Sequence, residues 1–354
     1  MSKRRIGFLS YWGVGRGLAA ATLNFVKMIK DDYDIYILQQ FENTIGKEYQ
    51  LPNINVEVLN SYIVPVEVFK DWITRNKLDA VVFNEYNQWQ YDPQELVKVA
   101  KDMGCRTYAE LVMERFQPDQ VKYYDRLFMP TVTFQRVLRN YKVRNFSYIP
   151  FSIDLNEFPK EQKDIGTPFI FFHPGGFGGV HNRKNTQIVI DAFLKLNNTN
   201  TKLIITSQKP ISFTNLPENI EIIDKNMDRE ELIRYYYKAH ATILPSKWET
   251  IGIPILESLA AGTPVITSNA PPMNEFIRPG LNGYICTGNT IPYEGISVLG
   301  IEVDSATLKK AMENILNPTV YPMLCKNSRY IIEQLYDQQK NKHYLLDFLK
   351  NDLK

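Results

Sequence analysis

Two acidic residues, Glu249 and Glu257, are separated by seven residues that include Gly252 and Pro254. Proline is favoured at the first position of a helix and glycine just past its end, so we expect a short helix between Pro254 and Gly262. Glu249 then lies in the loop before this helix, and Glu257 lies about one turn inside it. Carboxylates in these two places can each accept hydrogen bonds from a polyhydroxyl ligand.

The segments on either side of this helix are predicted strands, over residues 241–245 and 263–268. Strand, glycine-containing loop, helix and strand make a βαβ unit, and open α/β sheets bind ligands at the carboxyl ends of their strands. The free N–H groups and positive dipole end of such a helix suit phosphate or sugar oxygens. The pattern alone also fits a purely structural alternative, in which Glu249 caps a helix and Glu257 lies on a solvated face.

A second candidate site follows the predicted strand over residues 169–173, where four glycines precede Arg183, Lys184 and a helix. The loop is not a P-loop, because that motif has glycine directly before its lysine and here Arg183 precedes Lys184. Glycines such as Gly176 let the backbone approach a ligand closely. An arginine and a lysine at the start of a helix can clamp a diphosphate.

A glycine-containing turn also follows the first predicted strand, over residues 5–12. Gly13 and Gly15 match the dinucleotide-binding pattern G-x-G-x-x-G, but Leu18 occupies the third glycine position. No acidic residue ends the next predicted strand, over residues 34–40, where the ribose of such a cofactor would be held. A nicotinamide-dependent dehydrogenase is therefore disfavoured.

Residues 242–288 contain the run PSKWETIGIPILESLAAGTPVITS, followed by a loop with Glu275 and then GLNG. This stretch resembles the donor-site region of the retaining glycosyltransferases of family four (glycosyltransferase group 1), which have the GT-B fold. It matches nearly every fixed position of the family pattern. Ile251 stands where phenylalanine is usual, and APPMNE replaces the usual glycine-containing loop.

The resemblance implies an α/β fold with two Rossmann-like domains that face each other across a cleft. Predicted strands and helices alternate through the chain, as a parallel, helix-covered sheet requires, with a helix over residues 66–76 as one example. We expect an N-terminal, acceptor-side domain over residues 1–160 and a C-terminal, nucleotide-sugar-binding domain over residues 161–335. The tail from Pro322 onward has a helical pattern, and by resemblance a last helix over residues 336–354 crosses back onto the first domain.

The resemblance also implies roles for individual residues. Lys184 and Arg183 would hold the donor phosphates and, with Glu249, form the catalytic group. Glu249 would contact the sugar hydroxyls or support an oxocarbenium-like state, and Glu257 would bind the ribose. The other donor-binding candidates are Gly15 and Arg16 in the first turn, Gly176 and Ser207 at strand ends, Thr250, Ile251 and Gly252 in the glutamate loop, and Asn226 and Met227 near the base.

The first half of the chain departs from the family at one position. The family commonly has a histidine at a strand end in the first domain, near the sugar, whereas all four histidines of this chain lie at residue 173 or beyond. The predicted strand over residues 105–112 places Glu110 where that histidine would fall. Glu110 and Glu85 are therefore candidate acceptor or sugar contacts. The alternative is that both are strand-end carboxylates paired with arginines.

Composition restricts the remaining possibilities. The chain has 354 residues, of which 44% are hydrophobic and 23% charged, and its net charge of +2 favours no nucleic-acid partner. Three distant cysteines give neither a disulfide framework nor zinc-ligand spacing. The sequence has no signal-peptide pattern and no apolar run near the length of a membrane span. We expect a cytoplasmic protein, with peripheral membrane contact left open.

Together these features predict a retaining, metal-independent glycosyltransferase of the hexosyltransferase class. Its donor would be a UDP- or GDP-linked sugar, used as a co-substrate with no other cofactor, and its acceptor a glycan or a lipid-linked molecule. One alternative is a catalytically weak homologue that serves as a nucleotide-binding or partner subunit. Another is a nucleotide-sugar epimerase on a similar fold, which would release no free diphosphate.

Overall fold

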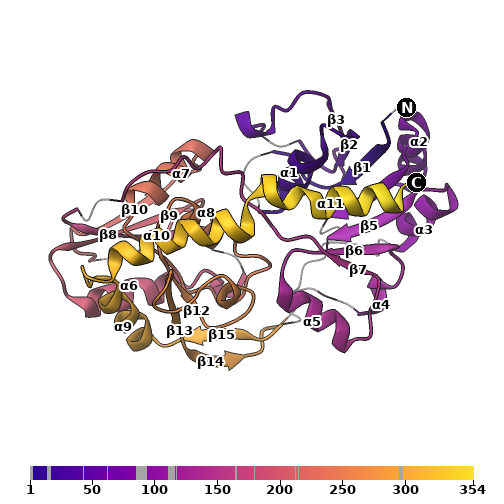
Figure 1. Cartoon of the computed structure of the whole chain (residues 1–354). Helices are drawn as coiled ribbons and strands as arrows, with labels where there is room; N and C mark the ends of the chain where they lie inside the picture. Colours follow the sequence, from indigo (N-terminus) through magenta and orange to yellow (C-terminus); the bar gives the residue numbers. More distant parts are fainter. Residues whose placement is uncertain are drawn as a thin grey trace. The chain divides into compact units, whose positions relative to one another are not determined.

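The computed structural model describes residues 3–13, 17–42, 44–61, 63–84, 94–110, 116, 118–163, 166–178, 180–211, 213, 215–294 and 298–354 (Figure 1). The chain divides into two compact units. The first unit contains Met1–Ser152 together with Gln338–Lys354, and the second contains Ile153–Asp337. Each unit has its own parallel sheet with helices packed on it, so the predicted α/β class is confirmed.

The first unit is built on a seven-stranded parallel sheet in the order β3-β2-β1-β4-β5-β6-β7. Its central strand, β4, is buried along its whole length and is apolar except at Asn84, as expected for a sheet covered on both faces. The strands are β1 (Arg5–Leu9), β2 (Asp34–Gln39), β3 (Ile54–Val58), β4 (Ala80–Asn84), β5 (Arg106–Glu110), β6 (Arg126–Met129) and β7 (Phe146–Tyr148). The helices are α1 (Gly17–Ile29), α2 (Val66–Asn76), α3 (Gln94–Asp102), α4 (Pro118–Val121), α5 (Val132–Asn140) and α11 (Gln338–Asp352), with a short 3-10 helix at Lys47–Tyr49.

The second unit is built on a six-stranded parallel sheet in the order β10-β9-β8-β11-β12-β13 and also contains an antiparallel hairpin. The sheet strands are β8 (Phe169–Gly176), β9 (Thr201–Ser207), β10 (Ile220–Asp224), β11 (Ala241–Leu244), β12 (Val265–Ser268) and β13 (Gly283–Cys286), and the hairpin is formed by β14 (Gly288–Ile291) and β15 (Gly300–Val303). The helices are α6 (Thr186–Leu196), α7 (Arg229–Lys238), α8 (Ile253–Ala260), α9 (Ser305–Ile315) and α10 (Tyr321–Ile331). Short 3-10 helices lie at Val180–Asn182 and Met273–Glu275.

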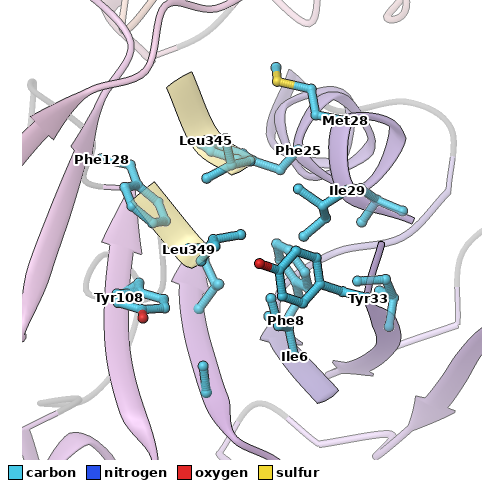
Figure 2. Packing of buried hydrophobic residues seen from close by; sticks show 14 of the residues in the cluster. Ile6, Phe8, Phe25, Met28, Ile29, Tyr33, Tyr108, Phe128, Leu345 and Leu349 are labelled. Atoms are coloured by element: carbon cyan, nitrogen blue, oxygen red, sulfur yellow. The ribbon is translucent and has the colours of Figure 1, made fainter. Parts of the chain in front are cut away.

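The C-terminal segment completes the core of the first unit, as predicted. Leu345 and Leu349 of α11 lie in one buried cluster with Phe25 of α1 and with Tyr108 and Phe128 of the sheet (Figure 2). The polar end of the helix is fixed as well. The Asp352 carboxylate accepts hydrogen bonds from Arg106 Nε at 2.8 Å, from Arg106 NH2 at 2.7 Å and from the Tyr108 hydroxyl at 2.7 Å. A helix distant in sequence is therefore held by both apolar packing and a charged anchor.

A substitution at Asp352 tests the contribution of this anchor to stability. We expect Asp352→Asn to lower the free energy of unfolding by about 1–2 kcal/mol, because hydrogen bonds to a charged group are lost at a partly exposed site where solvent screens the pair. The hydrogen bond from Arg106 lowers the pKa of Asp352, so the wild-type advantage should fade as acid protonates this carboxyl. Urea unfolding measures the change. Asp347→Asn, at an exposed position of α11, is the matched control, and an equal loss in both variants would contradict the role of the anchor.

The tail is not one continuous helix. α10 continues into a π-helical turn at Ile332–Tyr336, and Asp337, with φ −74° and ψ 121°, separates that turn from α11. The break arises because the backbone pairs elsewhere, with Ile153 N donating to Tyr336 O at 2.7 Å and Ile153 forming a parallel bridge with Asp337. The two places where the chain passes between the units are thus tied together.

Candidate functional site

The loop between β11 and α8 carries Glu249 and turns at a residue whose conformation favours glycine. Gly252, the residue before α8, has φ 85°, a left-handed conformation that other residues seldom adopt. A Cβ added there would also lie 3.2 Å from Ile255 Cδ1. Pro254 follows in the first turn, as the sequence predicts. Thr250 is half-buried and Ile251 is buried in the same loop.

The loop between β8 and α6 carries Arg183 and Lys184 and has an unusual backbone. His181, Asn182 and Asn185 all have positive φ values, of 52°, 49° and 58°. Asparagine tolerates this conformation better than most residues, but three such residues in five mark a turn held by its surroundings. The Arg183 carbonyl accepts a hydrogen bond from Lys247 N at 2.8 Å, which ties this loop to the glutamate loop.

The two loops bring Arg183, Lys184 and Glu249 into one cluster. Lys184 Nζ lies 2.6 Å from Glu249 Oε1, and the Arg183 guanidinium pairs with Glu249 Oε2. Ser246 Oγ donates a further hydrogen bond to Oε1 at 2.7 Å. Burial alone would raise the pKa of Glu249, but the charges of Arg183 and Lys184 outweigh it and lower the pKa to about 2. The cluster therefore carries two cations and one carboxylate, a net charge of +1.

This arrangement suits an anionic ligand. The Lys184 side chain is 10% exposed and that of Arg183 is 23% exposed, so both cations act in a partly desolvated place where charge interactions are stronger than in water. A diphosphate would find two charge-assisted donors within one cluster. Glu249 holds the two cations in the absence of such a ligand.

Glu257 lies in a second cluster, further along α8. Its carboxylate is almost fully buried, pairs with Arg229 through Oε1 and accepts a hydrogen bond from the Tyr236 hydroxyl to Oε2 at 2.9 Å. Arg229 Nε also lies 2.8 Å from Glu157 Oε2. Glu257 is therefore not on a solvated face, and its ribose-binding role stays a prediction.

The other donor-binding candidates of the second unit lie at strand ends. Ser207, at the end of β9, donates from its hydroxyl to Gly176 O at 3.2 Å, so these two candidates are in direct contact. Asn226 is exposed and Met227 half-buried in the loop between β10 and α7, which leads into Arg229. The structure thus gathers candidates at the carboxyl ends of neighbouring strands, where open α/β sheets bind ligands.

Glu110 ends β5 in the first unit, beside Asn84 of β4. Glu110 is 3% exposed and Asn84 is 2% exposed, and Glu110 Oε2 and Asn84 Oδ1 find no hydrogen-bond partner among the described residues. Burial raises the pKa of Glu110 to about 8. The alternative pairing with a neighbouring arginine is not seen in the described part of the chain. Gly15, Arg16 and Glu85 lie outside the described residues.

Several residues of these clusters were missed by sequence reasoning. Ser246 belongs to the PS run that preceded Glu249, so a signal for it was present. Arg229 and Tyr236 had none, because they reach Glu257 from another helix. His173 is fully buried between Ile243 O and Thr186 Oγ1, and burial lowers its pKa to about 4, which fits a structural role.

The sequence of the second unit matches a known protein family. Residues 157–292 match the model of the glycosyl transferases group 1 family. This segment, which makes up most of the second unit, therefore belongs to that family. All the charged residues of both clusters, from Glu157 to Glu257, lie within the matched residues.

Relatives and solved structures extend the comparison to the whole chain. The chain is 24% identical to an alpha-monoglucosyldiacylglycerol synthase of Streptococcus pneumoniae over 339 residues, which cover 87% of this chain and 71% of that protein. A Rickettsia africae glycosyltransferase structure superposes with a TM-score of 0.76 at 16% identity, covering 100% of both chains. The Anabaena protein HepE, solved with UDP and glucose, superposes with a TM-score of 0.71 at 14% identity, covering 98% of this chain and 100% of that one.

These likenesses show that the chain has the predicted GT-B fold. The alignments with the first two curated relatives cover only 33% and 20% of the length of those proteins.

Proposed function

We propose that the protein transfers a sugar from a nucleoside-diphosphate sugar to a glycan or lipid-linked acceptor, with retention at the anomeric carbon and without a metal ion. The observation that carries this proposal is the cluster of Arg183, Lys184 and Glu249, with its net charge of +1 in a partly desolvated place. The second unit is the donor side and the first unit is the acceptor side.

The chemistry follows from where charge develops. Breaking the bond between the sugar and the diphosphate leaves negative charge on the phosphate oxygens. Cationic side chains that are already in position stabilise this charge without reorganisation, and such preorganised groups often supply the largest catalytic contribution. Arg183 and Lys184 take this role. Glu249, released in part from them as the diphosphate binds, contacts the sugar hydroxyls or the cationic sugar of the transition state.

The donor is proposed to be UDP-linked, with GDP-linked sugars as the alternative. The support is that HepE, whose fold resembles this one over nearly the whole chain, was solved in complex with UDP-glucose. Glu257 is proposed to bind the ribose, and the loop with Asn226 and Met227 to contact the base. Neighbouring backbone N–H groups at Thr250, Ile251 and Gly252 would hold the sugar and its phosphate.

A lipid-linked acceptor has two supports. The S. pneumoniae relative that spans most of the chain is, by its name, a synthase of a glycolipid. Residues 132–146 of the first unit also contain four exposed basic side chains and no acidic one, namely Arg136, Arg139, Lys142 and Arg144. Such a surface suits anionic headgroups. No helix within the described ranges is long and apolar enough to cross a bilayer. The basic side chains of residues 132–146 support a proposed peripheral association at the cytoplasmic face.

A donor panel tests the proposal. UDP-, GDP-, ADP- and dTDP-linked sugars are incubated with the protein and acceptor extracts, with and without EDTA, and released nucleoside diphosphate is measured. We expect release from one donor, unchanged by EDTA and reduced in Lys184→Ala. Binding of a nucleotide with no release would instead favour a partner subunit, and an isomerised sugar with no free diphosphate would favour an epimerase.

A further inference from the structure

Arg229 is the first residue of α7 and lies between two carboxylates from different parts of the second unit. Its guanidinium pairs with Glu257 of α8 and, through Nε at 2.8 Å, with Glu157, which lies just after the point where the chain enters this unit. The guanidinium carbon also lies 5.7 Å from the centre of the Phe158 ring. Two segments distant in sequence, α8 and residues 157–158, therefore converge on the first residue of α7.

The charges of this cluster do not cancel. One guanidinium faces two carboxylates, so the net charge is −1. Burial alone would lower the pKa of Arg229, but the charges of Glu257 and Glu157 outweigh it and raise the pKa, so the arginine stays charged. Burial and the Glu257 charge raise the pKa of Tyr236 well above its ordinary value, so its hydroxyl stays a donor. Both neighbours of Glu257 thus donate to it at any physiological pH.

The geometry allows the Glu257 carboxylate to accept further hydrogen bonds from a ligand. A carboxylate offers about four acceptor directions, two on each oxygen. Arg229 takes one on Oε1 and Tyr236 takes one on Oε2, so each oxygen keeps one direction. Two acceptors side by side on one carboxylate match the two adjacent hydroxyls of a ribose. The excess negative charge favours such hydroxyl donors and disfavours a phosphate at this position.

We infer that Arg229 is a positioning residue that fixes Glu257 to read the 2′- and 3′-hydroxyls of the nucleotide, with Glu157 holding Arg229 in turn. This inference rests on the proposed function, because it takes the ligand of Glu257 to be a nucleoside diphosphate. It predicts that the protein selects a ribonucleotide donor over a deoxyribonucleotide donor such as a dTDP-sugar. The donor panel can detect this preference.

The test compares binding of UDP and 2′-deoxy-UDP to the full chain by calorimetry, or of the GDP pair if the panel selects guanine. Hydrogen bonds to a charged group are worth roughly a 10- to 100-fold change in affinity, so we expect wild-type protein to prefer UDP by that factor. Arg229→Met should weaken UDP binding about 10-fold and 2′-deoxy-UDP binding by a smaller factor, because that ligand has only the 3′-hydroxyl contact to lose. In turnover, KM for the donor should rise while kcat changes little.

Two further variants separate positioning from charge and from folding. Arg229→Lys keeps the charge but lacks the planar fork, so it should restore part of the UDP preference. The double variant Arg229→Met with Glu157→Gln leaves a single carboxylate and the original net charge of −1, and it should still lose the preference. Thermal unfolding confirms that each variant is folded.

The outcomes are distinct. Equal binding of UDP and 2′-deoxy-UDP to wild-type protein that releases UDP from a donor overturns the inference and leaves the proposed function intact. Equal weakening of both nucleotides by Arg229→Met shows a structural role only and also overturns it. A ribose preference that depends on Arg229, in a protein that releases no nucleoside diphosphate from any donor, supports the inference and overturns the proposed transferase function. Failure to bind any nucleotide overturns both.

Discussion

Replacing Lys184 by methionine is expected to reduce release of nucleoside diphosphate by about 100- to 1,000-fold, the usual effect of removing one preorganised donor that faces developing negative charge. The loss should appear in kcat more than in KM, because the ammonium matters most when the sugar–phosphate bond is breaking. Initial rates over a range of donor concentrations measure both values.

A matched control lies close by in the same unit. Lys247 is 12% exposed and pairs with Glu302 at 2.7 Å, much as Lys184 is 10% exposed and pairs with Glu249 at 2.6 Å. Lys247→Met therefore removes an equally buried paired lysine outside the proposed clamp, and we expect its turnover to stay within about threefold of wild type. Similar losses in both variants would mean that the effect of Lys184→Met comes from disturbed folding, and the clamp would then be abandoned.

Replacing Glu110 by glutamine is expected to make the protein more stable than wild type at pH 9 and to remove a pH dependence that wild type shows between pH 5 and pH 8. Burial raises the pKa of this carboxyl from 4.5 to about 8 in the folded chain. A group with a higher pKa in the folded state lends stability below its unfolded pKa and loses it as pH rises through the folded pKa. The free energy of unfolding of the wild-type protein should therefore fall by up to about 4 kcal/mol as the pH rises through this range.

Urea unfolding at pH 5, 7 and 9 measures this effect. Glutamine keeps the shape and the neutral state of the protonated carboxyl, so the variant should show a flatter curve across this range. Glu67→Gln, whose side chain is 83% exposed in the same unit, should keep the wild-type pH dependence. A wild-type curve that is flat between pH 5 and pH 8 would show that Glu110 ionises normally, and the buried, protonated carboxyl would be rejected.

Local patterns predicted much of the fold. The helix expected over residues 66–76 is α2 with the same bounds, and the helix expected between Pro254 and Gly262 is α8. Both follow from apolar spacing and end signals within one stretch of chain. The edge strand β3 was missed because its side chains are largely exposed and its alternation is weak. The hairpin of β14 and β15 was missed for a related reason, since β14 is short and mostly exposed.

The candidate site was predicted in part. The spacing of Glu249 and Glu257 and the basic pair at residues 183 and 184 were visible in the sequence, but their mutual pairing was not. Arg183 and Glu249 are 66 residues apart, and their contact exists only because β8 and β11 are neighbours in the sheet. Arg229 gave no signal at all, since an arginine at the start of a helix is ordinarily solvated. Contacts between distant elements depend on strand order, which hydrophobic periodicity does not encode.

The division of the first unit between two segments of chain has a consequence for synthesis. Residues 338–354 are made after the whole of the second unit, so Phe25 and Phe128 have no Leu345 or Leu349 to pack against until then. The second unit is one uninterrupted segment and can reach its native packing earlier. During synthesis the second unit is therefore completed before the first, although the first unit begins earlier in the sequence. Until α11 arrives, the nascent first unit exposes the apolar surface that chaperones recognise.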